Sequence, residues 1–171
     1  RGADIIVDIH PDGEYDPGVI PAGIQAIKEG AKLVLGNRFY DLYSPLHSGM
    51  FFWKLIPLIL LTKLDKIIFR EQIDDFHQGF RIYTKSLLNK IDISKNSNGY
   101  IFSFEIIAQT IFNKHKISQV NVQTHYAGKK RGASFKSSLI YSLDTFRVLL
   151  FYIYSKLFHK VSIFKSKEKK A

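Results

Sequence analysis

The stretch ADIIVDIHPDGEYDP, residues 3–17, decides the fold, because it joins a strand pattern to the start of a helix. Its first part, residues 3–9, is a short apolar run rich in β-branched side chains, which predicts a buried strand. Asp16 and Pro17 have the form of a helix N-cap followed by proline at the first helical position. The stretch therefore predicts a strand, a polar turn at the carboxyl end of that strand, and a helix.

The residues that follow complete a strand–helix–strand unit. Apolar side chains recur at helical spacing up to Gly30, and residues 33–35 form a second short apolar run. The two strands of such a unit run parallel, so we expect an α/β fold. Further along, the patterns predict strands at residues 80–83 and 117–123, and helices at residues 50–69 (with a kink at Pro57), 85–90, 101–113 and 138–159.

The composition narrows the functional classes. Of the 171 residues, 46% are hydrophobic, which is enough for one domain with a packed core. There is no cysteine, so disulfides and thiolate metal sites are excluded. A net charge of +10 suits a phosphate-bearing substrate, anionic lipid or nucleic acid. We expect no nucleic-acid partner, because the basic residues are scattered and the aromatic residues cluster with aliphatic ones.

His10 and Asp12 follow the first predicted strand directly, at the edge where α/β sheets bind ligands. One offers a nitrogen ligand and the other a hard oxygen ligand. Together they could share an Mg²⁺ or Mn²⁺ ion that also binds a diphosphate. Alternatively, the segment is an ordinary turn in which Asp16 caps the helix and Asp12 is solvated.

One further acidic cluster and one single glutamate are candidates for chemistry. The segment Asp74-Asp75-Phe76-His77-Gln78-Gly79-Phe80-Arg81 places a carboxylate, an imidazole and a guanidinium around a glycine turn. Its alternative is a charged loop in which Arg81 pairs with an aspartate. Glu105 falls on the apolar face of the helix predicted at residues 101–113. Burying it unpaired is costly, so it needs a partner, and an ion pair within the core would also meet that need.

Basic residues form two candidate phosphate sites. One is Gly36-Asn37-Arg38 together with Lys54, and the other is the loop KKRGASFK at residues 129–136. Arginine side chains and the backbone N–H groups of glycine loops bind phosphate well. The alternative for both segments is a solvated basic face.

Taken together, these motifs resemble the family 2 glycosyltransferases, in particular those that transfer a hexose to a polyprenyl phosphate. The family's metal-binding signature is matched at Asp12, Gly13, Asp16 and Pro17, with His10 in place of an aspartate. The family's Asp-x-x-x-Gly-Phe-Arg motif is matched at Asp75, Gly79, Phe80 and Arg81. The resemblance implies a GT-A fold, a Rossmann-like mixed sheet flanked by helices. It also implies transfer of a hexose from a nucleotide-diphosphate sugar with inversion at the sugar carbon.

The resemblance also implies roles for the candidate residues. Asp12 and His10 would bind the metal, and the imidazole favours Mn²⁺ over Mg²⁺. Asp75 would lie near the reacting sugar carbon as a base or a positioning group. The acceptor side would be formed by Arg38, His77, Arg81 and Glu105. The donor diphosphate would be bound by Arg131, Ser134 and Lys136.

Two acceptors and one non-catalytic function remain open. A polyprenyl phosphate is mostly ionised at neutral pH, because its second pKa is about 6, so Asp75 would act by positioning. A glycan hydroxyl would instead require Asp75 to take a proton. The third possibility is a non-catalytic relative that binds membranes.

The helix predicted at residues 138–159 favours a lipid acceptor at a membrane surface. Its lysine-rich end suits an anionic leaflet. No run reaches the roughly 18 apolar residues of a spanning helix, so we expect peripheral or monotopic attachment at the cytoplasmic face of a membrane. Alternatively, this helix packs against its own domain or against a partner protein. Its apolar positions at helical spacing are Leu139, Leu143, Phe146, Leu150, Ile153 and Leu157.

We expect two parts in the chain. Residues 1–136 would be the C-terminal portion of a GT-A catalytic domain, and residues 137–171 an amphipathic helix with a basic tail. Members of the family begin with a nucleotide-binding half, which nothing in this sequence matches. We therefore expect that half to precede Arg1, and the chain alone to have little activity.

Overall fold

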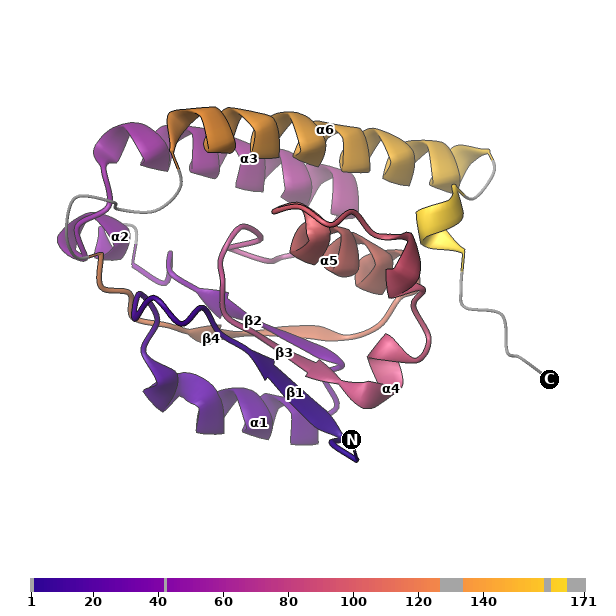
Figure 1. Ribbon diagram of the computed structural model, residues 1–171, viewed down its shortest axis with the longest axis horizontal. Helices are drawn as coiled ribbons and strands as arrows, with labels where there is room; N and C mark the ends of the chain where they lie inside the picture. The colour runs from indigo at the N-terminus through magenta and orange to yellow at the C-terminus, as the bar shows by residue number, and fades with distance from the viewer. Residues whose placement is uncertain (1, 42, 127–133, 159–160, 166–171) are drawn as a thin grey trace.

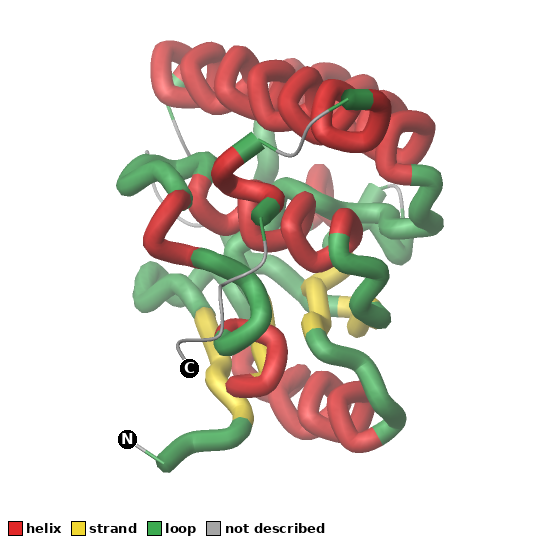
Figure 2. Tube along the Cα trace, turned by 90° about the vertical axis from the view of Figure 1, so that its right-hand side faces the viewer, coloured by secondary structure: helices red, strands yellow, loops and turns green. Residues whose placement is uncertain are grey.

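The computed structural model describes residues 2–41, 43–126, 134–158 and 161–165, and its elements are stacked in layers (Figure 1). A four-stranded sheet lies in the middle, with α1 (Ile20–Lys28) on one face and α5 (Phe102–Phe112) on the other. Two long helices, α3 (Phe52–Phe69) and α6 (Phe135–Leu157), form the outermost layer on the α5 side. The side view in Figure 2 shows the same layering, with α1 and the long helices at opposite ends.

The sheet is mixed. Its strands are β1 (Ile5–Asp8), β2 (Leu33–Asn37), β3 (Arg81–Thr84) and β4 (Ile117–Asn121), in the spatial order β1-β3-β2-β4. β3 pairs antiparallel with both of its neighbours, and β2 pairs parallel with β4. The fold is therefore the expected mixed α/β sheet flanked by helices.

The strand–helix–strand unit differs from the sequence expectation in one respect. β1 and β2 run in the same direction, as predicted, but β3 lies between them and pairs with both. The crossover through α1 thus leaves room for one strand. That strand is preceded by the segment at residues 74–80, so the insertion brings this polar loop to the carboxyl ends of β1 and β2.

Helix starts follow local capping signals. Asp16 accepts a hydrogen bond from the backbone N–H of Gly18 at 2.8 Å and caps a 3₁₀ turn, Pro17–Val19, that leads into α1. The helix expected at residues 138–159 begins earlier, at Phe135, because the Ser134 hydroxyl caps it. The remaining short elements are α2 (Ser44–His47), α4 (Lys85–Leu88), and the 3₁₀ turns Ile93–Lys95 and Ser162–Phe164.

Two apolar clusters hold the layers together. Strand β2 is buried throughout and contributes alternate side chains to both clusters, as a central strand must. Leu33 and Leu35 join the cluster formed with α5 and α6, and Val34 joins the one formed with α1. Gly23 of α1 allows the helix to lie close to the sheet, since a Cβ there would collide with the Ile82 side chain.

The two outer helices run parallel to each other. Near their N-terminal ends, the Trp53 and Phe135 rings lie 6.2 Å apart. Toward their C-terminal ends, Phe69 and Tyr152 pack edge to face with centroids 4.8 Å apart. Both helices therefore begin at the edge of the sheet where β1 and β2 end (Figure 1).

Candidate active site

The candidate site lies where the carboxyl ends of β1 and β2 meet the loop that precedes β3. Open α/β sheets bind ligands at this edge. β1 leads into His10 and Asp12, β2 leads into Arg38, and the loop supplies Asp75 and His77. The fold therefore gathers residues that are far apart in the sequence.

A buried ion pair between Arg38 and Asp75 forms the centre of this region. The guanidinium binds the carboxylate with two bonds, Nε to Oδ2 at 2.7 Å and Nη2 to Oδ1 at 3.0 Å. The side chain of Arg38 is 6% exposed and that of Asp75 is 0% exposed. Burial alone would lower the pKa of Arg38, but the Asp75 carboxylate reverses the effect and holds this pKa well above its ordinary value.

Tyrosines and backbone groups complete the surroundings of the pair. Arg38 donates from Nη1 to the Tyr126 hydroxyl at 3.1 Å and from Nη2 to the carbonyl oxygen of His77 at 3.0 Å. The Tyr15 hydroxyl accepts a hydrogen bond from the backbone N–H of Gly79 at 2.7 Å. Burial raises the pKa of Tyr15 to about 12, so this phenol stays neutral at physiological pH.

Behind the pair, the ring of His77 lies between two helices. Its Nε2 is 2.8 Å from Oδ2 of Asp65 on α3, and its Nδ1 is 2.9 Å from the hydroxyl of Tyr141 on α6. Burial raises the pKa of Asp65, and the contact with His77 partly opposes that shift. His77, predicted to line the acceptor side, therefore points its ring into the protein.

Arg81 occupies the first position of β3, directly opposite Asp8 of β1. Its Nη1 lies 3.9 Å from Oδ2 of Asp8, and its buried Nε has no hydrogen-bond partner among the described residues. The guanidinium is thus only loosely paired, which leaves donor capacity for a ligand.

His10 and Asp12 lie at the rim of the same edge. Their Nδ1 and Oδ2 atoms are 3.8 Å apart, and the side chains are 54% and 47% exposed. The His10 ring sits against Gly79, where an added Cβ would lie 2.8 Å from the ring. Within the described part of the chain, no three His, Cys, Asp or Glu side chains gather around a common point. An ion here would have two protein ligands, and phosphate oxygens and water would complete its shell.

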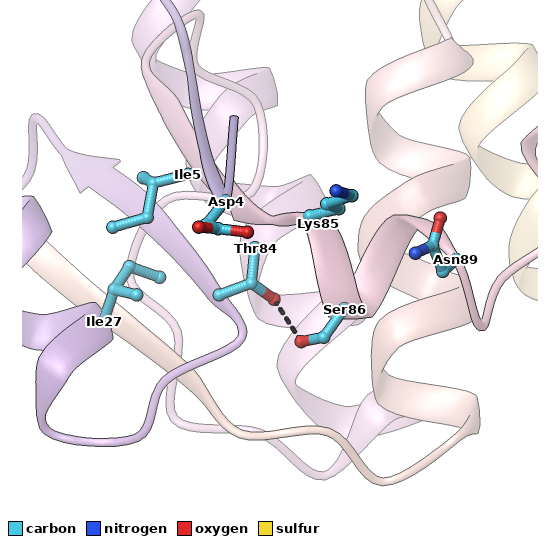
Figure 3. Close-up of a pocket in the computed structure, with 7 residues that line it drawn as sticks. All are labelled: Asp4, Ile5, Ile27, Thr84, Lys85, Ser86 and Asn89. Atoms are coloured by element: carbon cyan, nitrogen blue, oxygen red, sulfur yellow. Dashed lines mark hydrogen bonds between the residues drawn. The ribbon is translucent and has the colours of Figure 1, made fainter. Parts of the chain in front are cut away.

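Two cavities lie away from this region. One of about 370 Å³ opens at the amino end of β1, and Figure 3 shows its lining, in which the Ser86 hydroxyl bonds that of Thr84. Another, of about 500 Å³, lies between the C-terminal halves of α3 and α6. Neither is lined by Arg38 or Asp75.

Comparison with known proteins agrees with the motifs. No family model matches the chain. Over 126 residues it is 27% identical to a polyprenol monophosphomannose synthase of Mycolicibacterium smegmatis, which covers 71% of this chain and 46% of that protein. Over 129 residues it is 27% identical to an undecaprenyl-phosphate mannosyltransferase of Micrococcus luteus, covering 71% of this chain and 49% of that protein. The chain thus spans about half the length of these relatives.

A solved structure agrees with the fold. The glucosyl-3-phosphoglycerate synthase of Mycobacterium tuberculosis, solved with Mn²⁺, uridine diphosphate and phosphoglyceric acid, superimposes with a TM-score of 0.61 over 89% of this chain and 49% of its own. The sequences are 17% identical, so this likeness concerns the fold alone. The chain is therefore similar in sequence to polyprenyl-phosphate mannosyltransferases of the family 2 type, and its fold matches that of a GT-A glycosyltransferase.

Most of the residues predicted for the candidate site come together, but some do not. Arg38, Asp75, His77 and Arg81 surround one region, with His10 and Asp12 at its rim. Glu105 is engaged elsewhere, because it accepts hydrogen bonds from the backbone N–H and hydroxyl of Ser97, both at 2.7 Å, and lies 3.9 Å from Arg147. Ser134 caps the N-terminus of α6, Lys136 lies in its first turn, and Arg131 lies outside the described residues.

Sequence patterns did not identify four residues in this region: Tyr15, Asp65, Tyr126 and Tyr141. Of these four, only Asp65 could have been noticed in the sequence, because it is a carboxylate within the apolar stretch that forms α3. A buried acid in such a helix needs a partner, and the structure supplies His77.

Replacing Asp75 with asparagine is expected to destabilise the protein by about 3–5 kcal/mol, because it leaves the Arg38 charge buried without a counter-charge. Asp74→Asn is the matched control. Asp74 is 47% exposed and pairs with Lys66 at the surface, so its loss should cost at most about 1 kcal/mol. Denaturant unfolding of both variants measures the difference, and equal losses would mean that the buried pair is not a major contributor to stability.

Proposed function

We propose that this chain forms the acceptor- and metal-binding part of a glycosyltransferase that transfers a hexose from a nucleotide-diphosphate sugar to a polyprenyl phosphate at a membrane surface. The names of the two relatives described above support the transfer of a hexose to a polyprenyl phosphate. The observation that supports a phosphate acceptor most directly is that Asp75 is buried and paired with Arg38.

Asp75 favours a phosphate acceptor over a hydroxyl acceptor. A general base needs an accessible oxygen, but Asp75 is fully buried and both of its oxygens bind the Arg38 guanidinium. A phosphate monoester arrives largely ionised at neutral pH and needs no base. The role that this geometry supports for Asp75 is to orient Arg38.

The reaction then needs little proton transfer. An oxygen of the acceptor phosphate attacks the anomeric carbon, and the bond from that carbon to the nucleoside diphosphate breaks with inversion. Arg81, with spare donor capacity, would bind and orient the acceptor phosphate, and Arg38 would lie beside it, held in place by Asp75. The positive charge at this edge also lowers the cost of bringing two anionic substrates together.

His10 and Asp12 would hold a divalent ion. The pair of one nitrogen and one carboxylate donor suits Mn²⁺, and both side chains are accessible to a donor diphosphate. Such an ion supplies neutralisation of the charge that develops on the leaving diphosphate. The synthase of similar fold was solved with Mn²⁺, which is consistent with this assignment.

The outer helices offer a surface for the lipid. All six apolar positions expected on the last helix are exposed, and α3 adds Phe52, Ile56, Leu60 and Ile67 alongside. Apolar areas of this extent are rare on monomers unless they bind something, and basic residues on the same helices suit anionic headgroups. Within the described residues, no helix has the length and apolar character to cross a bilayer. We therefore propose that α3 and α6 lie flat on the membrane.

Substituting Asp12 with alanine in the complete enzyme, in which this chain is joined to a nucleotide-binding half, should lower transfer by at least about 100-fold, because the leaving group loses its neutralising ion. The assay supplies membranes with polyprenyl phosphate, Mn²⁺ and a panel of labelled nucleotide sugars, with Asp74→Ala as the control. Label in a lipid fraction supports the proposal. Label on a soluble glycan would point to a hydroxyl acceptor, and no transfer by any folded variant would point to a non-catalytic relative.

Gly79→Ala should weaken Mn²⁺ binding without unfolding the protein, because the new methyl group displaces the His10 ring, which has open space to move into. Gly99→Ala is the control, since a Cβ there meets nothing within 4 Å. Paramagnetic broadening of the His10 ring resonances on Mn²⁺ addition detects even weak binding. Equal broadening in the two variants would argue against His10 as a ligand.

Replacing Leu143 and Leu150 with aspartate should reduce binding to vesicles that contain anionic lipid by about 10-fold or more, because both side chains are exposed on the proposed membrane face. Ile93→Asp, an exposed apolar residue outside that face, is the control. Co-sedimentation measures both. If the control and the double variant bind vesicles alike, the face of α6 is not the contact surface.

A further inference from the structure

His77 stands out because its backbone and its ring approach polar groups in two different directions. On its backbone side, the N–H donates to Oδ1 of Asp75 at 3.2 Å, and the carbonyl oxygen accepts from Nη2 of Arg38 at 3.0 Å. The backbone of one residue therefore contacts both members of the buried ion pair.

On its side-chain side, His77 contacts three helices. The ring lies 2.8 Å from Asp65 on α3 and 2.9 Å from Tyr141 on α6, and it stacks on Phe104 of α5 with centroids 5.3 Å apart. With Nε2 protonated toward the carboxylate, Nδ1 accepts the Tyr141 hydroxyl hydrogen. Burial raises the pKa of Tyr141, which keeps this hydroxyl a donor.

Packing alone does not account for this chain of polar groups. Asp65 is completely buried, and neither of its oxygens makes a well-aligned hydrogen bond to any described residue, although Nε2 of His77 is close. An acid in such surroundings is costly, and apolar side chains of similar size would fill the same space at lower cost. The contacts therefore suggest a positioning role.

We propose that His77 is a positioning residue that links the placement of α3 and α6 to the geometry of the Arg38–Asp75 pair. Its ring is fixed by Asp65 and Tyr141, and its backbone in turn fixes the guanidinium and the carboxylate. A shift of either helix is thereby transmitted through one residue to the ion pair.

This link gives the outer helices a second role. They bear the exposed apolar face. A membrane surface that binds this face and fixes the position of the two helices therefore also sets the orientation of Arg38. This consequence for catalysis rests on the proposed function, but the mechanical link itself does not.

The link is tested on the chain itself by following the Arg38 Nε–H group with ¹⁵N NMR. Tyr141→Phe removes one hydroxyl, and Asp65→Asn removes one charge. Each should shift this resonance and speed its exchange with solvent by about 10-fold or more, while the exchange of the Ile82 amide in the central sheet changes less. Ser142→Ala is the matched control, because the Ser142 hydroxyl bonds within α6 to the carbonyl of Ser138.

Replacing His77 itself distinguishes a role of its polar ring atoms from a role of its volume in packing. Glutamine can place an amide near the position of Nε2, so His77→Gln should retain more protection of Arg38 Nε–H than His77→Leu. The proposal is overturned if Tyr141→Phe and Asp65→Asn leave the Arg38 signal as in the control. It is also overturned if the loss of protection at Arg38 matches that at Ile82, which would indicate a merely structural role.

A parallel transfer assay in the complete enzyme separates this link from the proposed function. Tyr141→Phe should lower kcat with little change in the KM for the nucleotide sugar, because Arg38 is placed on the acceptor side. If the unsubstituted enzyme transfers no sugar while the NMR result holds, the proposed function fails and the link stands. If transfer occurs and the NMR signal does not change, the link fails alone.

Discussion

The arrangement of the segments around the candidate site depends on the buried ion pair between Arg38 and Asp75. Arg38 and Asp75 are both removed from water, and such a pair is tolerated only when the geometry is good and the remaining donors are satisfied. Tyr126 and the carbonyl of His77 meet those needs from two other segments. The end of β2, the loop before β3 and the segment after β4 are therefore held in one arrangement, because moving any of them would expose or orphan a charge.

Local signals in the sequence predicted the elements well. The apolar runs became β1 and β2, and Asp16 and Pro17 began a helical segment as their types indicate. The start of α6 was missed, although Ser134 offered a cap signal. The insertion of β3 between β1 and β2 could not be predicted, because strand pairing over such separations depends on the whole core and leaves no local pattern.

Candidate residues were easier to single out from the sequence than their contacts. Asp75 and Arg38 were both identified from motifs, yet nothing in the sequence indicated that they would bind each other across 37 positions. The same holds for His77, which was expected to face a ligand and instead faces Asp65 and Tyr141. Motifs specify which chemical groups are present, whereas burial and pairing arise only when distant segments pack.

The parallel course of α3 and α6 has an electrostatic consequence. The peptide dipoles of a helix sum to a partial positive charge at its N-terminus. Because both helices begin at the edge where β1 and β2 end, two such partial charges lie on the same side of the molecule, and α3 is not capped there by an acidic residue in its first turn. The backbone of the outer layer therefore adds to the attraction of anions toward that edge, independently of any side chain.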